Sequence, residues 1–362
     1  MKKIFSALVL CSLFSCTVQP TLPIFDLSDA SKFGQSHIMP IDSLFSKIEE
    51  IRLETQNAPL IGPIYALYET SDAYYVCDGT LYVFAKDGKY IRQIGAIGRG
   101  PGEYLSMSKC VVDEKSGDLL AFDYYGQNLL RYSTEWRPID AFSTLTQDSL
   151  FYVKSFFMDH NIPIFYRDNN SLQMDLLAFD WNAKTTTPIS KSEREMLAGE
   201  GILESVFSFG FPERPYVFSY FSETVFLLEN QHLTPVFTIP VGRYKCTFEE
   251  LATLQISGPK TQISGIVQGG DYAFVLFHGA NVSGGRAIPC LGLYNMRSGA
   301  SYPQIKIQDA QYAYHSLSGD SELFQGFDPQ TLLTVQYPEN MRESGVQISE
   351  NDNPVIIKYW FK

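Results

Sequence analysis

The sequence is poor in charged residues and has no cluster of Lys and Arg. Charged residues make up 19% of the 362 residues, and the formal net charge is −12 at pH 7. An acidic surface without a basic cluster repels phosphate backbones, so we expect no nucleic-acid partner. An anionic membrane surface is disfavoured as a binding partner for the same reason.

Catalytic signatures are also missing from the sequence. No Gly-x-Ser-x-Gly sequence occurs, so the sharp turn that presents the serine of many hydrolases is not encoded. The five histidines are scattered, and no two are four residues apart, which excludes a zinc site built from a helical His pair. We therefore assign no catalytic residue. The sequence favours a non-enzymatic protein, and enzymatic activity stays open.

Cysteine provides no obvious framework. Two of the six cysteines lie near the N-terminus, and the other four are Cys77, Cys110, Cys246 and Cys290. These four share no Cys-x-x-Cys or metal-binding spacing. Buried free thiols and disulfides both remain compatible with the sequence.

Aromatic residues, by contrast, are abundant and make up 14% of the chain. They occur in apolar runs such as Tyr74–Val76 and Phe156–Met158. Aromatic and β-branched residues suit a pleated surface that is packed on both sides. The composition therefore predicts an all-β core with little helix.

A repeated strand pattern organises the chain. Residues 81–95 predict two strands joined by a tight turn at Asp87-Gly88. The first of these strands recurs, and the six copies align on Phe84, Tyr132, Phe179, Leu228, Tyr294 and Tyr359. The steps between copies are 48, 47, 49, 66 and 65 residues. Such a spacing is typical of propeller blades, so the predicted fold is a six-bladed β-propeller with four-stranded antiparallel blades.

The limits of the blades follow from the turn residues between the strands. The predicted blades are 64–95, 107–142, 152–189, 206–239, 263–307 and 323–361. A strand over residues 48–53 precedes the first blade, while the last blade lacks an outer strand. We expect this early strand to complete the last blade and close the ring, in one domain over 44–362. Capping-box spacings predict short helical inserts at 192–195 and 247–250.

The N-terminus has the pattern of an export leader. Lys2 and Lys3 are followed by an apolar stretch from Ile4 to Leu13, which is too short to span a bilayer. Leu13-Phe14-Ser15-Cys16 resembles the bacterial lipobox, in which the cysteine receives a lipid and becomes the new N-terminus. Residues 1–16 are thus predicted as a lipoprotein signal peptide and Cys16 as the lipidation site, with an ordinary signal peptide as the alternative. Residues 17–43 are predicted as a spacer.

Topology predicts where a ligand would bind. In a meander, the loop that enters the first strand and the loop that leaves the second lie at the same end of the blade. The crossing 98–104 and the long loops 278–288 and 337–353 should therefore share one rim. The candidate ligand-binding residues on this rim are Asp78, Arg99, Glu103, Tyr104, Asp123 and His278.

Each of these candidates also has a structural interpretation. In the crossing Gly98-Arg99-Gly100-Pro101-Gly102, glycines would supply positive φ angles and Pro101 would stiffen the turn, with Arg99 and Glu103 as an ion pair. Carboxylates at strand ends commonly cap turns. Asp78, Glu103 and Asp123 could alternatively offer oxygen ligands to calcium, although no cofactor is required by the sequence.

Several segments resemble a known family. Ile51–Thr55, Gly98–Tyr104, Ser219–Phe226 and Asn353–Ile357 are similar to the six-bladed β-propeller lipoproteins of Bacteroidetes, within the broader TolB-like and NHL-type propeller group. The resemblance implies the fold and export to the cell envelope, but it carries no catalytic residues. Residues 17–20 lack the acidic run found after the cysteine in some surface lipoproteins of these bacteria. Anchorage at the periplasmic face of the outer membrane is therefore favoured over surface display.

Two functional hypotheses result. The first is a monomeric, lipid-anchored binding or scaffold protein that uses its rim for a protein, peptide or glycan. The alternative is a calcium-dependent hydrolase of the lactonase type that uses the central funnel. A structural role in an outer-membrane complex is a third interpretation.

Overall fold

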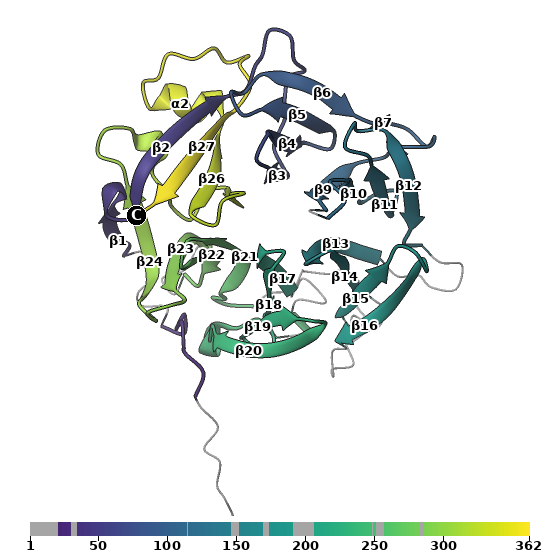
Figure 1. Cartoon of the computed structure of the whole chain (residues 1–362). Coiled ribbons are helices and arrows are strands. Elements are labelled where there is room, and N and C mark those ends of the chain that lie inside the picture. The colour runs from purple at the N-terminus through teal and green to yellow at the C-terminus, as the bar shows by residue number, and fades with distance from the viewer. Residues whose placement is uncertain are drawn as a thin grey trace, which may run out of the picture.

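A computed structural model describes residues 21–29, 35–113, 115–145, 152–168, 174–190, 206–247, 249–250, 257–281 and 286–362. Six sheets of at least four strands stand around a central axis, each following the last along the chain (Figure 1). Within each sheet, the consecutive strands pair antiparallel, so each blade is a meander. The predicted six-bladed β-propeller is confirmed.

The strands of the first three blades alternate with short turns. Blade 1 contains β3 (Ala66–Glu69), β4 (Ala73–Cys77), β5 (Leu81–Ala85) and β6 (Tyr90–Ile94); blade 2 contains β9 (Met107–Val112), β10 (Leu119–Asp123), β11 (Asn128–Tyr132) and β12 (Pro138–Ser143); blade 3 contains β13 (Tyr152–Asp159), β14 (Ile162–Asp168), β15 (Met174–Asp180) and β16 (Thr185–Ser190). The crossing from blade 1 to blade 2 holds a short parallel pair, β7 (Ala96–Ile97) and β8 (Glu103–Tyr104).

The remaining blades follow the same plan. Blade 4 contains β17 (Val206–Phe211), β18 (Arg214–Ser219), β19 (Thr224–Glu229) and β20 (His232–Thr238); blade 5 contains β21 (Gln262–Gly269), β22 (Tyr272–Gly279), β23 (Ile288–Asn295) and β24 (Ser301–Gln308); blade 6 contains β25 (Leu323–Gln325), β26 (Thr331–Gln336) and β27 (Val355–Phe361), completed by β2 (Phe45–Arg52). The helical elements with described bounds are η2 (Ile41–Ser43), η3 (Gly242–Tyr244), η4 (Ala313–His315) and α2 (Pro338–Glu343). No described helix is long and apolar enough to cross a membrane.

The ring closes through β2, as predicted. β2 lies antiparallel to β27, with Ile51 opposite Ile356 and Ile48 opposite Tyr359. Blade 6 thus combines an outer strand from the N-terminal part of the chain with three strands from the C-terminal part. Both edges of β27 are paired with a neighbouring strand. Closure in this way removes an exposed strand edge.

The N-terminal segment runs along the outside of blades 4 and 5 before it reaches β2. Phe25 donates its N–H to Thr238 at 2.8 Å, and β1 (His37–Pro40) pairs parallel with β24. Phe25 has no exposed surface. The described part of the predicted spacer 17–43 therefore belongs to the propeller.

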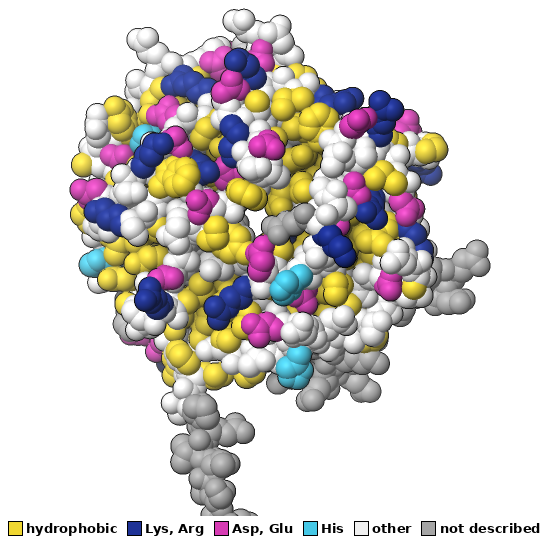
Figure 2. Space-filling view, in the orientation of Figure 1, with side chains coloured by type: hydrophobic (Ala, Val, Ile, Leu, Met, Phe, Trp, Pro, Cys, Tyr) yellow, Lys and Arg dark blue, Asp and Glu magenta, His cyan; other side chains and the backbone are white. Residues whose placement is uncertain are grey.

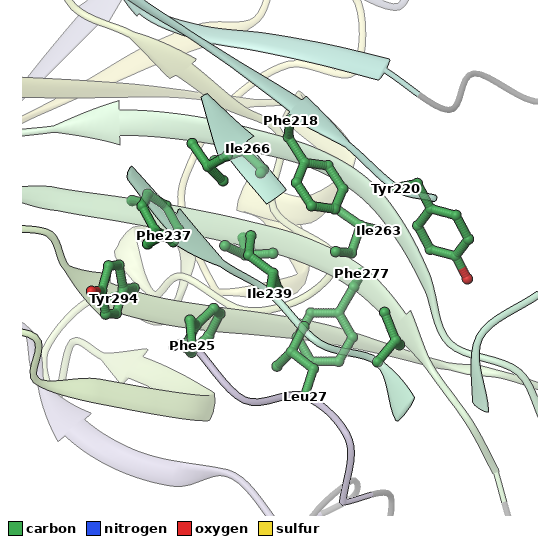
Figure 3. Close-up of a cluster of buried hydrophobic side chains, with 14 of the residues drawn as sticks. Phe25, Leu27, Phe218, Tyr220, Phe237, Ile239, Ile263, Ile266, Phe277 and Tyr294 are labelled. Carbon is green, nitrogen blue, oxygen red and sulfur yellow. The ribbon is translucent and has the colours of Figure 1, made fainter. Parts of the chain in front are cut away.

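The core is divided among the spaces between blades. Each of the six clusters of buried apolar side chains lies between two neighbouring blades. Figure 3 shows the cluster between blades 4 and 5, which includes Phe25, Leu27, Phe237 and Tyr294, and the ring centres of Phe25 and Tyr294 lie 5.7 Å apart. Gly292 allows this approach, because a Cβ there would lie 2.6 Å from the ring of Phe25. No blade can bury its faces alone, so the ring folds as one unit.

The predicted inserts and thiols can also be located. Thr247 and Glu250 form the predicted capping box: Thr247 donates its N–H to Glu250 Oε2 at 2.8 Å, and Glu250 donates its N–H to Thr247 Oγ1 at 3.2 Å. The insert predicted at 192–195 and the lipidation site Cys16 lie outside the described residues. Cys77, Cys110, Cys246 and Cys290 are all buried free thiols.

Candidate functional site

A cavity of about 1420 Å³ occupies the centre of the ring. All six innermost strands line it, and blades 2, 3 and 4 contribute the small side chains of Ser108, Ser155 and Ser208. Figure 2 shows the hollow at the ring centre, with apolar and charged side chains around it. The volume exceeds the range of about 300–1,000 Å³ that is usual for small-molecule pockets.

The cavity reaches one particular end of the ring. Its lining includes Thr70–Ser71, Phe211–Glu213 and Gly326–Pro329. These are turns between the first and second strands of blades 1, 4 and 6. In a meander, those turns lie at the end opposite to the interblade crossings. The described cavity therefore opens at the end opposite to the predicted rim.

A buried charged group forms part of the cavity wall between blades 6 and 1. Lys358 donates a hydrogen bond to Glu69 Oε1 at 2.5 Å, and Lys86 donates to the same oxygen. The N–H of Phe327 donates to the other oxygen, Glu69 Oε2, at 2.8 Å. The side chain of Glu69 is fully buried and that of Lys358 is 8% exposed, while Lys86 is 34% exposed. We call these three residues the Lys–Glu–Lys group.

The position of each member follows from local structure. Side chains along β27 alternate between two faces of the strand. One face packs against blade 5, and the other carries Ile356, Lys358 and Trp360, so Lys358 faces blade 1. Glu69 ends the innermost strand of blade 1, and Lys86 follows the third strand of that blade. The strand ends and turns of two blades thus bring the three charges together.

The electrostatics of the group keep Glu69 ionised. Burial opposes ionisation, but the hydrogen bonds from Lys358, Lys86 and the Phe327 N–H outweigh it, so the pKa of Glu69 lies below its ordinary value. Burial lowers the pKa of Lys86, and the hydrogen bond to Glu69 only partly offsets that effect. Burial and the Glu69 charge raise the pKa of Tyr74. One ionised carboxylate therefore accepts hydrogen bonds from two ammonium groups.

Aromatic rings adjoin both lysines. Lys86 Nζ lies 4.1 Å from the centre of the Tyr74 ring, and Lys358 Nζ lies 4.6 Å from the Trp360 ring. The indole N–H of Trp360 donates to Glu49 Oε2 at 2.9 Å. Phe327, at the turn of blade 6, is 48% exposed. The wall thus combines charged side chains of both signs with flat apolar surfaces.

The predicted rim residues lie at the other end of the ring, where two of them cap blade crossings. Asp78 accepts N–H groups from Gly62 at 2.9 Å and Thr80 at 3.1 Å. Asp123 accepts N–H groups from Leu105, Ser106 and Gly126 at 2.9–3.0 Å. These carboxylates hold the loops that enter their own blades, which is the structural interpretation of a strand-end acid.

The glycine-rich crossing folds around the side chain of Glu103. Gly100 donates its N–H to Glu103 Oε2 at 2.6 Å. A Cβ on Gly98 would lie 2.0 Å from the same oxygen, so this glycine provides space, not a positive φ. Gly102 has φ +74°. The predicted positive φ is therefore correct for Gly102 and wrong for Gly98 and Gly100. Glu103 accepts its hydrogen bond from a backbone amide and does not pair with Arg99.

The remaining rim candidates differ in exposure. Tyr104 is fully buried; its hydroxyl donates to the carbonyl of Ile94 at 3.0 Å and accepts the N–H of Leu81 at 3.2 Å. Arg99 and His278 are exposed. The structure therefore places Tyr104 in the core between blades 1 and 2 and leaves the ligand-binding role of the others a prediction.

A second cavity, of about 470 Å³, lies on the predicted rim beside α2. Its lining is mainly polar and consists of Ala313, Tyr314, Ser316, Ser318, Asp320, Ser321, Glu322, Val335, Gln336, Tyr337, Asn340, Glu343 and Ser344. Part of the predicted long loop 337–353 therefore borders a depression. Nowhere in the described ranges do three or more His, Cys, Asp or Glu side chains gather so as to hold a metal ion.

Sequence reasoning missed the Lys–Glu–Lys group. One signal was available, because Lys358 interrupts the otherwise apolar run Val355–Phe361. A charged residue inside an apolar strand needs a partner when it is buried. The identity of that partner could not be read from the sequence, since Glu69 lies 289 residues away.

Comparisons with known proteins place the chain in a family. Residues 22–359 match the family described as "Domain of unknown function (DUF4934)". No curated protein sequence matches the chain.

Solved structures show the same fold at low sequence identity. The Bacteroides fragilis NCTC 9343 protein BF0058, named as an exported protein, has a TM-score of 0.64 and 15% identity, covering 94% of this chain and 99% of that one. A DUF4221 family member from Bacteroides vulgatus ATCC 8482 has a TM-score of 0.54 and 12% identity, covering 88% and 97%. Virginiamycin B lyase from Staphylococcus aureus, with a TM-score of 0.45 and 11% identity over 86% and 99%, is too distant to bear on function.

Proposed function

The chain belongs to the DUF4934 family, and we propose that it is an exported, lipid-anchored binding protein without catalytic activity. Its ligand, a peptide, protein segment or glycan, binds in the central cavity. The anchor is Cys16, and the propeller works in the cell envelope, at the periplasmic face of the outer membrane.

The observation that carries this proposal is the central cavity. It holds about 1420 Å³, and all six blades contribute to its wall. Aromatic surfaces and a few fixed polar groups line it, which is the usual composition of a binding site. The carboxylates of the predicted rim, by contrast, accept hydrogen bonds from backbone amides. The geometry therefore favours the cavity over the rim as the place of binding.

The localisation rests on separate observations. The leader ends in Leu-Phe-Ser-Cys at Cys16, and the structurally similar BF0058 is named as an exported protein. Metabolic labelling with a radioactive fatty acid tests this part of the proposal. Wild-type protein should incorporate the label and fractionate with membranes, while Cys16→Ser should do neither. Equal labelling of both would contradict lipidation at this residue.

Binding is tested with two variants that obstruct opposite ends of the ring. Ser155→Trp places a large side chain on the cavity wall, and His278→Trp places one on the predicted rim. Both proteins are screened against the same glycan array and peptide library as wild type. We expect Ser155→Trp to lose the wild-type ligands and His278→Trp to keep them. Loss only in His278→Trp would assign binding to the rim, and a wild type that binds nothing would contradict the proposal.

A further inference from the structure

The Lys–Glu–Lys group has more positive than negative charge. Lys86 and Lys358 each carry one positive charge and share Glu69 Oε1 as an acceptor. Glu69 supplies one negative charge, and its other oxygen is occupied by the N–H of Phe327. One positive charge is therefore not balanced within the group.

Lys358 is the member with unused hydrogen-bonding capacity. An ammonium group has three N–H donors. Among the described residues, Glu69 is the hydrogen-bond partner of Lys358, and the face of Trp360 is its other close contact. The side chain is only 8% exposed, so water replaces the missing partners poorly. A buried ammonium with free donors favours the arrival of an anion.

Lys86, whose side chain is more exposed than that of Lys358, also favours the binding of an anion. It donates to Glu69 and to the carbonyl of Thr70 at 3.0 Å, and it remains partly exposed on the cavity wall. Burial and the nearby Lys358 charge both lower the pKa of Lys86. Glu69 already bridges the two ammonium groups, and a second anion beside them would offset the remaining repulsion.

The surroundings indicate what kind of anion fits. Trp360, Tyr74 and Phe327 offer aromatic faces next to the charges. The cavity is far larger than an inorganic ion requires. Flat apolar surfaces beside two ammonium groups suit an organic acid, whose carboxylate pairs with the lysines while its body lies on the rings.

We propose that Lys358 and Lys86 anchor a carboxylate of the ligand in the central cavity. The inference rests on the proposed binding function and narrows it to acidic ligands. Two sources carry such a group: a glycan that contains uronic acids and a peptide that ends in a free C-terminus. The chemistry at the lysines is the same for both, so the experiment has one arm for each.

Isothermal titration calorimetry at low salt compares matched pairs of probes. The glycan arm uses trigalacturonic acid and the neutral trisaccharide maltotriose. The peptide arm uses acetyl-Ala-Ala-Phe with a free C-terminus and the same peptide as its amide. We expect at least one acid to bind more tightly than its neutral partner, with the affinity falling as salt is added. Whichever acid binds identifies the source.

Variants then assign the effect to the lysine. Lys358→Met should weaken binding of that acid by about ten- to hundredfold, the loss typical of a hydrogen bond to a charged group. Lys358→Arg should retain more of the affinity, because it keeps the charge. Lys47→Met is the matched control: Lys47 lies 5.7 Å from the same Trp360 ring but pairs with Glu49 at an exposed position. Circular dichroism and urea unfolding check that each variant is folded.

The outcomes separate this inference from the proposed function. Neutral probes that bind as tightly as the acids, or a folded Lys358→Met variant with unchanged affinity, would overturn the carboxylate anchor and leave the cavity as a binding site. Absence of saturable binding by either acid at millimolar concentration would also overturn it. Array ligands blocked by Ser155→Trp would still support binding in the cavity in that case.

Discussion

Replacement of Glu69 by Gln should lower the free energy of unfolding by about 3–5 kcal/mol, the usual cost of removing one partner from a buried ion pair. Gln keeps the size of Glu69 but not its charge. Lys358, whose side chain is 8% exposed, would then hold a buried charge without a counterion. Lys86 is 34% exposed and can turn toward water, so most of the cost should arise at Lys358.

Urea denaturation at pH 7, followed by far-ultraviolet circular dichroism, measures this loss. Glu135→Gln is a matched control, because Glu135 pairs with Arg137 at 3.3 Å where both side chains are exposed. That change should cost less than about 1 kcal/mol. The double variant Glu69→Gln/Lys358→Met should recover part of the lost stability, since it removes the buried charge as well.

The acid dependence of stability gives an independent check. The pKa of Glu69 in the folded protein is below the ordinary value of 4.5, because the hydrogen bonds to it outweigh the effect of burial. As the pH falls, the unfolded chain therefore takes up a proton at this position before the folded chain does. The stabilisation from Glu69 is present above about pH 4.5 and is lost as the pH falls through the folded pKa. The Gln variant should lack this part of the acid-induced loss.

A clear result would refute the reasoning. If Glu69→Gln unfolds within about 1 kcal/mol of wild type and shows the same loss of stability with acid, Lys358 is not held as a buried charge by this carboxylate. The charge argument for the central cavity would then fail too.

Three other predictions test the fold and the crossing. Phe25→Ala should lower the free energy of unfolding, measured by urea denaturation, by about 3–5 kcal/mol because the ring is fully buried. Ile24→Ala, at a side chain 59% exposed, should change it little. Equal effects would contradict the packing of the N-terminal segment. Gly98→Ala should destabilise through its clash with Glu103, and adding Glu103→Ala should relieve part of that loss in thermal melting. The four cysteines of the described chain should resist a thiol reagent in the native protein and react in urea, since all are buried; fast native labelling would be inconsistent with this structure.

The number of blades and the closure of the ring could be predicted because their signals are local. Each third strand places an aromatic or large apolar residue near a turn, and the copies recur along the chain. The unpaired pattern over residues 48–53 matched a last blade without an outer strand, and β2 indeed pairs with β27. Alternation along a strand and turn chemistry depend only on neighbouring residues.

The candidate site could be predicted only in part. Topology correctly grouped the crossing and the strand ends Asp78 and Asp123 at one end of the ring. It could not show that their carboxylates bind backbone amides or that the described central cavity opens at the other end. The path of residues 23–27 along blade 4 was also missed, because a parallel contact at the edge of a sheet has little sequence signature.

The sequence by itself determined an all-β ring of six modules, since strand periodicity and turn residues act over a few positions. Only the tertiary structure decided which charges meet. Glu69 and Lys358 are 289 residues apart and come within 2.5 Å because the ring brings blade 6 against blade 1. Burial there strengthens their interaction and makes an unpaired charge costly. The chemistry of the cavity wall therefore depends on contacts between side chains of blades 6 and 1, which no local pattern in the chain encodes.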